Sequence, residues 1–211
     1  MNKIEYAYKT HTACCAHAYL LPKIKQIIRS LGTAGRILDL GCGNGALSSE
    51  LSELGLCVFG VDRSESGIRI AQATFPEVKF SLADAEQELV PSYFPAESFD
   101  FVVSTEVVEH VYQPRQLIEN AFNLLKPSGY FIVSTPYHGY SKNLLLALSG
   151  KMDVHFTALW DGGHIKFWSR KTLSQLLVEC GFTDLRFVGA GRVPYFWKSM
   201  ILVARKNRLG P

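Results

Sequence analysis

Residues 37–45 read ILDLGCGNG, and this stretch decides the fold. An apolar run that contains an acid is followed by glycines at alternate positions, Gly41, Gly43 and Gly45, and then by a helical pattern. That order predicts a buried parallel strand, a tight turn and the start of a helix. Glycines in such a turn let the backbone come close to a bound small molecule, because no Cβ intervenes.

Strand and helix patterns alternate on both sides of this turn. The apolar runs predict strands at Ile37–Leu40, Cys57–Val61, Val78–Leu82, Phe99–Ser104, Tyr130–Ser134, Leu185–Val188 and Met200–Ala204. Amphipathic helices are expected between most of them, with Ser64, Pro114 and Ser169 at helix starts. The connection before the last strand is too short for a crossover, so that strand should be antiparallel. We therefore predict an α/β, Rossmann-like three-layer sandwich with a seven-stranded, mostly parallel sheet.

The chain divides into an N-terminal helical segment, 1–34, and one domain, 35–211. The region from Thr135 to Lys166 departs from the alternation, because connections usually have about 2–6 residues. It is rich in aromatic and apolar residues and follows the fifth strand, at the sheet edge where ligands bind. We interpret an insertion at about 137–166 as a lid over the substrate. The alternative is a helical insertion that only covers the core.

Composition limits the class of protein. The net charge of +3 is a weak electrostatic footprint, so a nucleic-acid partner is not expected. The five cysteines form no CxxC pair, which disfavours a disulfide framework or a zinc site and suggests a cytoplasmic protein. No apolar run is long enough to span a bilayer, so no membrane partner is expected.

Acidic residues fall at the carboxyl ends of four predicted strands: Asp39, Asp62, Asp84 and Glu106. Asp62 lies 21 residues beyond Gly41, where a carboxylate can accept hydrogen bonds from a ribose diol. This spacing fits NAD as well as other adenosine cofactors. The acidic surroundings favour a sulfonium cofactor without a pyrophosphate, and the antiparallel last strand is unusual for a dinucleotide fold.

Five motifs in order extend this interpretation. They are ILDLGCGNG, VDRS at 61–64, LADAE at 82–86, FDFVVSTEVVEHV at 99–111 and LKPSGYFIVSTP at 125–136. Together they resemble class I S-adenosylmethionine-dependent methyltransferases of the type 11/12 group, over roughly residues 35 to 204. The resemblance implies S-adenosylmethionine as cofactor and S-adenosylhomocysteine as product.

The resemblance also implies which residues hold the methionine part of the cofactor. The turn Gly41-Cys42-Gly43 should pass beneath it, and Asp39 should lie near its amino group. The aromatic residues near the N-terminus, Tyr6 and Tyr8 among them, either fold over the cofactor or pack on the sheet edge.

A second group is implied around the adenosine part. Asp62 should hold the ribose hydroxyls and Arg63 should flank the adenine. Asp84 should accept from the adenine amino group, with the backbone of Ala85 beside it. The alternative for Asp62 and Asp84 is a helix N-cap at a strand end.

Thr105 and Glu106 should border the site of methyl transfer, where the sequence continues to Glu109 and His110. If this segment is helical, Glu106 lies one turn from Glu109 and from His110. The stretch resembles ubiquinone-biosynthesis O-methyltransferases. It also resembles small-RNA 3′-end 2′-O-methyltransferases, whose ExxEH motif binds a metal with a further His; His164 is the counterpart here.

We favour catalysis without a metal, with His110 or His164 as general base or acceptor-positioning residue beside Glu109. A divalent cation held by Glu106, Glu109, His110 and His164 is the alternative.

The sequence therefore predicts an enzyme that transfers a methyl group from S-adenosylmethionine to a small-molecule acceptor, at a hydroxyl oxygen. The alternatives are an RNA 2′-O-methyltransferase with an ExxEH metal site, an NAD-dependent oxidoreductase and an inactive cofactor-binding partner subunit. The acceptor and the oligomeric state stay open.

Overall fold

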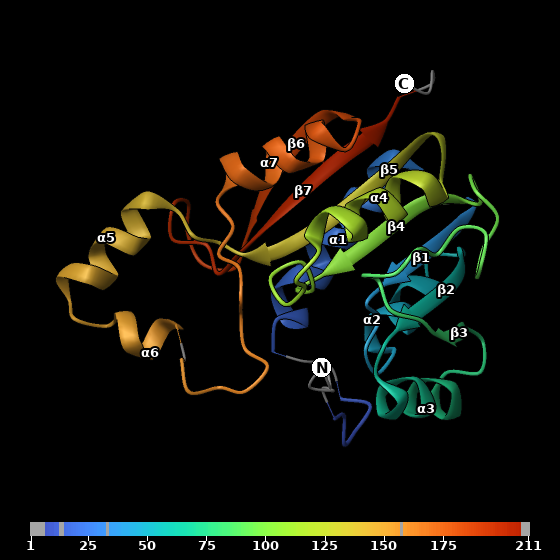
Figure 1. The fold of residues 1–211 in the computed structure, drawn as a ribbon, viewed down its shortest axis with the longest axis horizontal. Helices are drawn as coiled ribbons and strands as arrows, with labels where there is room; N and C mark the ends of the chain where they lie inside the picture. The colour runs from blue at the N-terminus through green and yellow to red at the C-terminus, as the bar shows by residue number, and fades with distance from the viewer. Residues whose placement is uncertain (1–6, 13–14, 33, 157, 208–211) are drawn as a thin grey trace.

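A seven-stranded sheet in the order β3-β2-β1-β4-β5-β7-β6 forms the centre of the molecule (Figure 1). The computed structural model describes residues 7–12, 15–32, 34–156 and 158–207, so Tyr6 lies outside the described residues. The strands are β1 Arg36–Leu40, β2 Cys57–Asp62, β3 Lys79–Leu82, β4 Phe99–Thr105, β5 Leu125–Pro136, β6 Phe182–Ala190 and β7 Ser199–Lys206. Strands β1 to β5 pair in parallel, and β7 is antiparallel to both β5 and β6. The predicted fold and the antiparallel last strand are confirmed.

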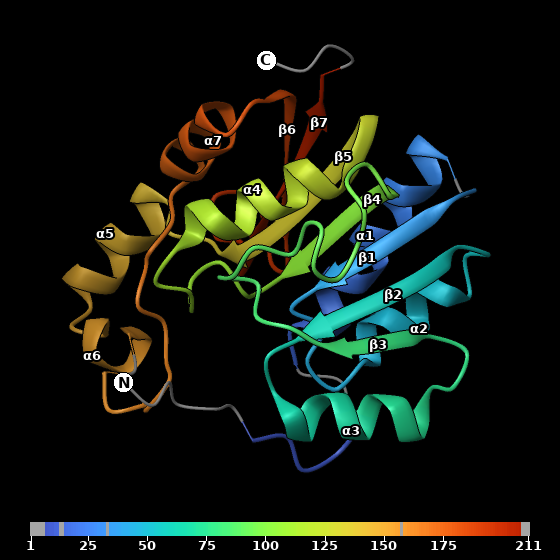
Figure 2. The same cartoon turned by 45° about the vertical axis from the view of Figure 1, so that its right-hand side comes forward.

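Helices cover both faces of this sheet (Figure 2). On one face lie α1 His17–Leu31, α2 Ala46–Ser52 and α3 Glu65–Thr74, and on the other lie α4 Pro114–Leu124 and α7 Arg170–Glu179. Neighbouring residues of one strand point to opposite faces, so Ile37 belongs to the core cluster that includes α1 to α3, whereas Leu38 belongs to the one that includes α4 and α7. Burial of one such side chain contributes about 1.5–3 kcal/mol to folding.

The helix starts follow the predicted caps. The Oγ of Ser64 accepts from the backbone N–H of Gly67 at the start of α3. Ser169 and Thr172 form a reciprocal capping box before α7, and Pro114 is the first residue of α4. These capping residues determine where each helix begins. They therefore also determine where the loops at the carboxyl edge of the sheet end.

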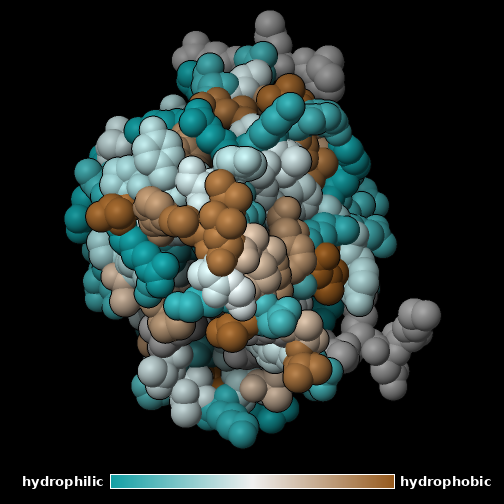
Figure 3. Space-filling view, turned by 90° about the vertical axis from the view of Figure 1, so that its left-hand side faces the viewer, coloured by the Kyte–Doolittle hydropathy of each residue, from teal (hydrophilic) through white to brown (hydrophobic). Residues whose placement is uncertain are grey.

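The segment after β5 folds into two short helices, α5 Tyr140–Leu148 and α6 Met152–Phe156. They extend away from the sheet beyond the end of β5 (Figure 1), and neither contains a buried residue. Apolar side chains gather on the face that carries them (Figure 3), including exposed Leu145, Leu148 and Trp160. No described helix combines the length and the apolar character needed to cross a membrane.

Candidate active site

The glycine turn after β1 lies against the end of β2. The backbone N–H groups of Gly41 and Cys42 both donate to the carbonyl of Val61, at 2.8 and 2.9 Å. Gly41 has φ +87°, and a Cβ there would collide with the side chain of Val107. Gly43 has φ +55°, and a Cβ there would collide with the ring and hydroxyl of Tyr8. Glycine is therefore required at both positions, sterically as well as conformationally.

Asp62, at the end of β2, holds this turn in shape. Its carboxylate accepts from the backbone N–H of Gly43 and of Ser64, both at 2.8 Å. Burial raises the pKa of Asp62, and the two backbone donors oppose that rise. Ser64, not Asp62, supplies the side chain that caps α3. The carboxylate thus lies against the glycine turn and against the start of α3.

Asp39 is a fully buried acid one strand away. Its Oδ2 accepts from Ser48 Oγ at 2.6 Å, but its Oδ1 has no partner among the described residues. Burial, with the nearby charge of Asp62, raises the pKa of Asp39 to about 7, against the Ser48 hydrogen bond. A buried carboxylate oxygen without a donor is costly, and an ammonium group would satisfy it.

Three further predicted residues lie where β2 and β3 end side by side. Asp84 Oδ1 accepts from the backbone N–H of Glu86 at 2.9 Å. The carbonyl of the buried Ala85 accepts from Asn120 Nδ2 at 3.0 Å. The guanidinium of Arg63 lies 3.9 Å from the Glu86 carboxylate. The backbone N–H of Ala83 donates to the carbonyl of Asp62 at 2.9 Å, so these residues follow strand ends that are paired at Asp62.

Residues 7–12 fold over the glycine turn, whereas α1 of the same N-terminal segment packs on the sheet. The backbone N–H of Tyr8 donates to Ser66 Oγ at 3.0 Å, which sets the Tyr8 ring against Gly43. Asn44 Nδ2 donates to the carbonyls of Thr10 and Thr12, at 2.9 and 3.0 Å. Asn44, which is nearly buried, was not among the predicted site residues; its place between two glycines of the turn was the available signal.

The stretch from Glu106 to His110 is a turn, so the conditional prediction of a helix there is wrong. Glu106, directly after Thr105, has φ +54°, and the backbone N–H of His110 donates to Val107. The Glu106 carboxylate accepts from Ser134 Oγ at 2.9 Å and from Ser199 Oγ at 3.2 Å, on β5 and β7. Burial raises its pKa to about 7 despite these donors.

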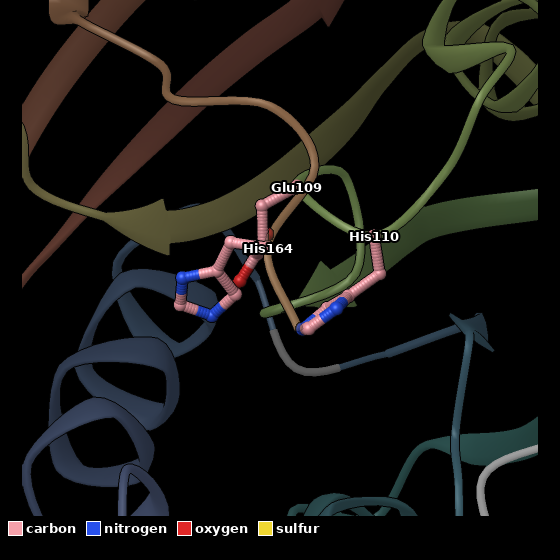
Figure 4. Close-up of side chains that lie close together, drawn as sticks. All are labelled: Glu109, His110 and His164. Carbon is pink, nitrogen blue, oxygen red and sulfur yellow. The ribbon is translucent and has the colours of Figure 1, made fainter. Parts of the chain in front are cut away.

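Glu109, His110 and His164 converge, with ligand atoms within 4.8 Å of one another (Figure 4). Glu109 and His110 come from the turn after β4, whereas His164 comes from the segment between α6 and α7. Both carboxylate oxygens of Glu109 are buried and lack a partner among the described residues. Burial, with the charge of Glu106, raises the pKa of Glu109. Glu106 is not part of this cluster.

Both imidazoles are neutral near pH 7. Burial lowers the pKa of His110 and lowers that of His164 to about 4. His110 Nδ1 lies 3.1 Å from the carbonyl of Gly162. Since a carbonyl only accepts, Nδ1 carries the hydrogen, and Nε2 keeps its lone pair.

The arm that carries His164 is fastened to the same turn. The backbone N–H groups of Ile165 and Lys166 donate to the Glu109 carbonyl, at 2.9 and 3.1 Å. The indole N–H of Trp168 donates to the Val108 carbonyl at 3.1 Å. These hydrogen bonds join two segments that are more than 50 residues apart in the sequence. The contact between His110 and Gly162 joins the same two segments across 52 residues.

A family model described as a methyltransferase domain matches residues 8–186. The chain belongs to this methyltransferase family. The protein is therefore an S-adenosylmethionine-dependent methyltransferase. Its fold, its glycine turn and the acidic residues at its strand ends are features of such an enzyme. The predicted NAD-dependent oxidoreductase is no longer a candidate.

Curated relatives agree with the predicted resemblance. The chain is 35% identical over 152 residues to a ubiquinone biosynthesis O-methyltransferase of Bradyrhizobium diazoefficiens, covering 71% of this chain and 56% of that protein. It is 40% identical over 129 residues to the protein of the same name from Caulobacter sp. strain K31, covering 59% and 48%. The chain spans about half the length of these relatives.

Solved structures share the fold. A magnesium protoporphyrin IX methyltransferase from Synechocystis PCC 6803, solved with S-adenosylhomocysteine, has a TM-score of 0.67 at 21% identity, covering 89% and 82% of the two chains. A putative methyltransferase from Bacillus halodurans has a TM-score of 0.69 at 18% identity, covering 89% and 98%.

Proposed function

We propose that this methyltransferase methylates a hydroxyl oxygen of a small molecule bound between the turn after β4 and the insertion. The observation that supports this is the cluster of Glu109, His110 and His164, with a neutral imidazole whose Nε2 is free to take a proton. The names of the curated relatives, O-methyltransferases of ubiquinone biosynthesis, support oxygen as the acceptor atom.

The residues around the glycine turn fit the cofactor. We assign the cofactor's amino end to Asp39, its methionine part to Gly41-Cys42-Gly43, its ribose to Asp62, and its adenine to Arg63, Asp84 and the Ala85 backbone. Thr105 and Glu106 are assigned to the border of the methyl-transfer site. When bound, S-adenosylmethionine supplies a methyl group on a sulfonium sulfur, and the sulfur keeps the bonding electron pair.

In this proposal the protein mainly aligns the acceptor and removes its proton. His110 Nε2 accepts the hydroxyl proton, while the Nδ1–H bond to Gly162 keeps the ring in place. The carboxyl group of Glu109, in its ionised form, stabilises the resulting imidazolium, and His164 positions the acceptor. Alignment of the reacting atoms can contribute up to ~7–11 kcal/mol, more than the proton transfer.

Aromatic rings on the insertion side favour an acceptor with apolar surface. His138 stacks on Phe156 with ring centroids 6.1 Å apart and meets Phe167 edge-on at 5.2 Å. Trp160 lies 5.9 Å from His164. We propose that the insertion, taken as 137–166, forms a lid whose aromatic side faces the acceptor.

A divalent cation in the same cluster is the second candidate. One carboxylate and two imidazoles form a common donor set for a transition metal, and the unpartnered oxygens of Glu109 fit one. Such an ion would bind the acceptor oxygen and lower the pKa of its hydroxyl. Turnover that is indifferent to added Mg²⁺, Zn²⁺ and EDTA would rule it out.

The proposal is tested first by ligand binding. S-adenosylhomocysteine at ~100 times its dissociation constant should add ~2.7 kcal/mol to the free energy of unfolding, and NAD should add nothing. The melting temperature should therefore rise by roughly 5–10 °C with S-adenosylhomocysteine. No rise would contradict the proposal.

Catalysis is tested next with His110→Gln. We expect kcat for a phenolic acceptor to fall about 10²–10⁴-fold while the affinity for S-adenosylhomocysteine stays the same. His17→Gln, in α1, is the matched control and should leave both unchanged. Cofactor binding without turnover on any hydroxyl acceptor would instead support the inactive partner subunit.

A further inference from the structure

Two cationic side chains beside the proposed acceptor site lack an acidic partner. Lys142, in the first turn of α5, is half-buried, and Arg192 lies in the turn between β6 and β7. Among the described residues, neither has a carboxylate within 4.0 Å, although six other lysine or arginine side chains do form such ion pairs: Lys25, Arg63, Arg115, Lys126, Arg205 and Lys206.

Backbone contacts bring these two residues to one corner. Lys142 Nζ donates to the carbonyl of Tyr137 at 2.6 Å, and the Tyr137 N–H donates to the carbonyl of Lys198 at 2.9 Å. The Lys198 N–H lies 3.2 Å from the carbonyl of Gly191, the residue before Arg192. Burial lowers the pKa of Lys142, and the charge of Arg192 lowers it further.

The same corner borders the proposed methyl-transfer site. Ser199, the neighbour of Lys198, donates to the Glu106 carboxylate at 3.2 Å. The charge of Glu106 attracts Lys142, but its oxygens already accept from Ser134 and Ser199. Glu106 therefore neutralises the charge of Lys142 only in part.

Neutral polar groups also face this corner without a partner. His138 Nδ1 and His155 Nε2 are buried and unpartnered among the described residues, and the two rings lie 5.6 Å apart. Burial, then the charge of Lys142, lowers the pKa of both. Each neutral ring has one N–H to donate to an anion.

The start of α5 adds to the positive potential. No side chain caps this nine-residue helix, and its first turn contains Lys142 but no acid. A cation is unfavourable at a helix N-terminus, so this arrangement is destabilising on its own. A bound anion would offset the helix charge and the repulsion between Lys142 and Arg192 together.

We propose that Lys142 and Arg192 form a subsite for an anionic substituent of the acceptor, a carboxylate or a phosphate group, beside the hydroxyl that is methylated. This inference rests on the proposed function, since it specifies the acceptor of the same site. The two cations bind the anionic oxygens, and the imidazoles of His138 and His155 donate to the remaining lone pairs.

The test compares an anion with its neutral analogue. Binding of 4-hydroxybenzoate, 4-hydroxybenzamide and phenyl phosphate is measured by calorimetry on the protein saturated with S-adenosylhomocysteine. We expect the benzoate to bind about 10–100-fold more tightly than the benzamide, as charge-assisted hydrogen bonds require. Preference for phenyl phosphate over the benzoate would identify the anion as a phosphate.

Substitutions show which residues cause the preference for the anionic ligand. Lys142→Met and Arg192→Gln should each remove the preference for the anion, while Lys142→Arg should keep it. Lys151→Met is the control, because Lys151 is an exposed lysine of the same insertion without a side-chain partner among the described residues. Circular dichroism and the melting temperature show whether each variant is folded.

Three results would overturn the inference: equal binding of benzoate and benzamide, a preference that survives in both neutral variants, or no benzoate binding at ~10 mM. Failure of the proposed function looks different, because S-adenosylhomocysteine would then not bind, or no hydroxyl acceptor would be methylated whatever its charge.

Discussion

At the scale of single residues, the proposed contact of Asp39 with the amino group of the cofactor predicts that cofactor binding depends on pH. Its carboxyl group has a pKa of about 7 without ligand, because it is buried. An ammonium group binds the ionised form, so the affinity for S-adenosylhomocysteine should rise as pH increases to about 7 and then level off. The limiting slope is about tenfold per pH unit, and binding should release a proton. Calorimetry in buffers of different ionisation enthalpy from pH 5.5 to 8.5 measures both.

The variant Asp39→Asn keeps the shape of the side chain and can still accept from Ser48. It should flatten the pH dependence and weaken binding by about 10–100-fold. Asp184→Asn, at a carboxylate that is 70% exposed, is the control. A pH profile in Asp39→Asn identical to that of the wild type would assign the effect to Asp62 or Glu106, whose pKa values burial also raises.

At the scale of elements, a side chain of the glycine turn holds residues 7–12 in place. Asn44 holds the carbonyls of Thr10 and Thr12, and this keeps Tyr8 over the turn. Asn44→Ala removes both donors, so S-adenosylhomocysteine should dissociate about 5–50-fold faster. Stopped-flow fluorescence measures this rate.

Thr12→Ala is the matched control, because it retains the backbone carbonyl that Asn44 binds. It should leave the dissociation rate unchanged. Hydrogen exchange of residues 7–12 should speed up in Asn44→Ala alone. An unchanged dissociation rate together with faster exchange would show that the segment moves without controlling release.

The elements also show what a sequence can and cannot predict. The strands and capped helices follow from local patterns, such as the apolar run at Ile37–Leu40 and the caps at Ser64 and Ser169, and those predictions were confirmed. The helical geometry considered for Glu106–His110 is not formed, because ExxEH spacing also fits a turn when distant serines hold Glu106. Lys142 and Arg192 were missed for a related reason, since their proximity depends on the contact between β5 and β7.

At the scale of the whole molecule, one cooperative sheet supports an insertion that adds little to stability. The two core clusters share the same strands, with Leu38 on one face and Ile37 on the other, so both faces should unfold together. Helices α5 and α6 contain no buried residue. Acceptor specificity can therefore be changed in the insertion while the cofactor-binding scaffold stays folded.

This difference between sheet and insertion predicts that a leucine-to-alanine substitution changes the free energy of unfolding much more in the sheet than in the insertion. Leu38→Ala removes a fully buried side chain in the central sheet and should lower the free energy of unfolding by about 2–5 kcal/mol. Leu148→Ala, at a residue that is 76% exposed on α5, should change it by less than about 0.5 kcal/mol. Urea unfolding followed by circular dichroism and by tryptophan fluorescence measures both. If Leu148→Ala proved as destabilising as Leu38→Ala, the insertion would be part of the core rather than a lid on it.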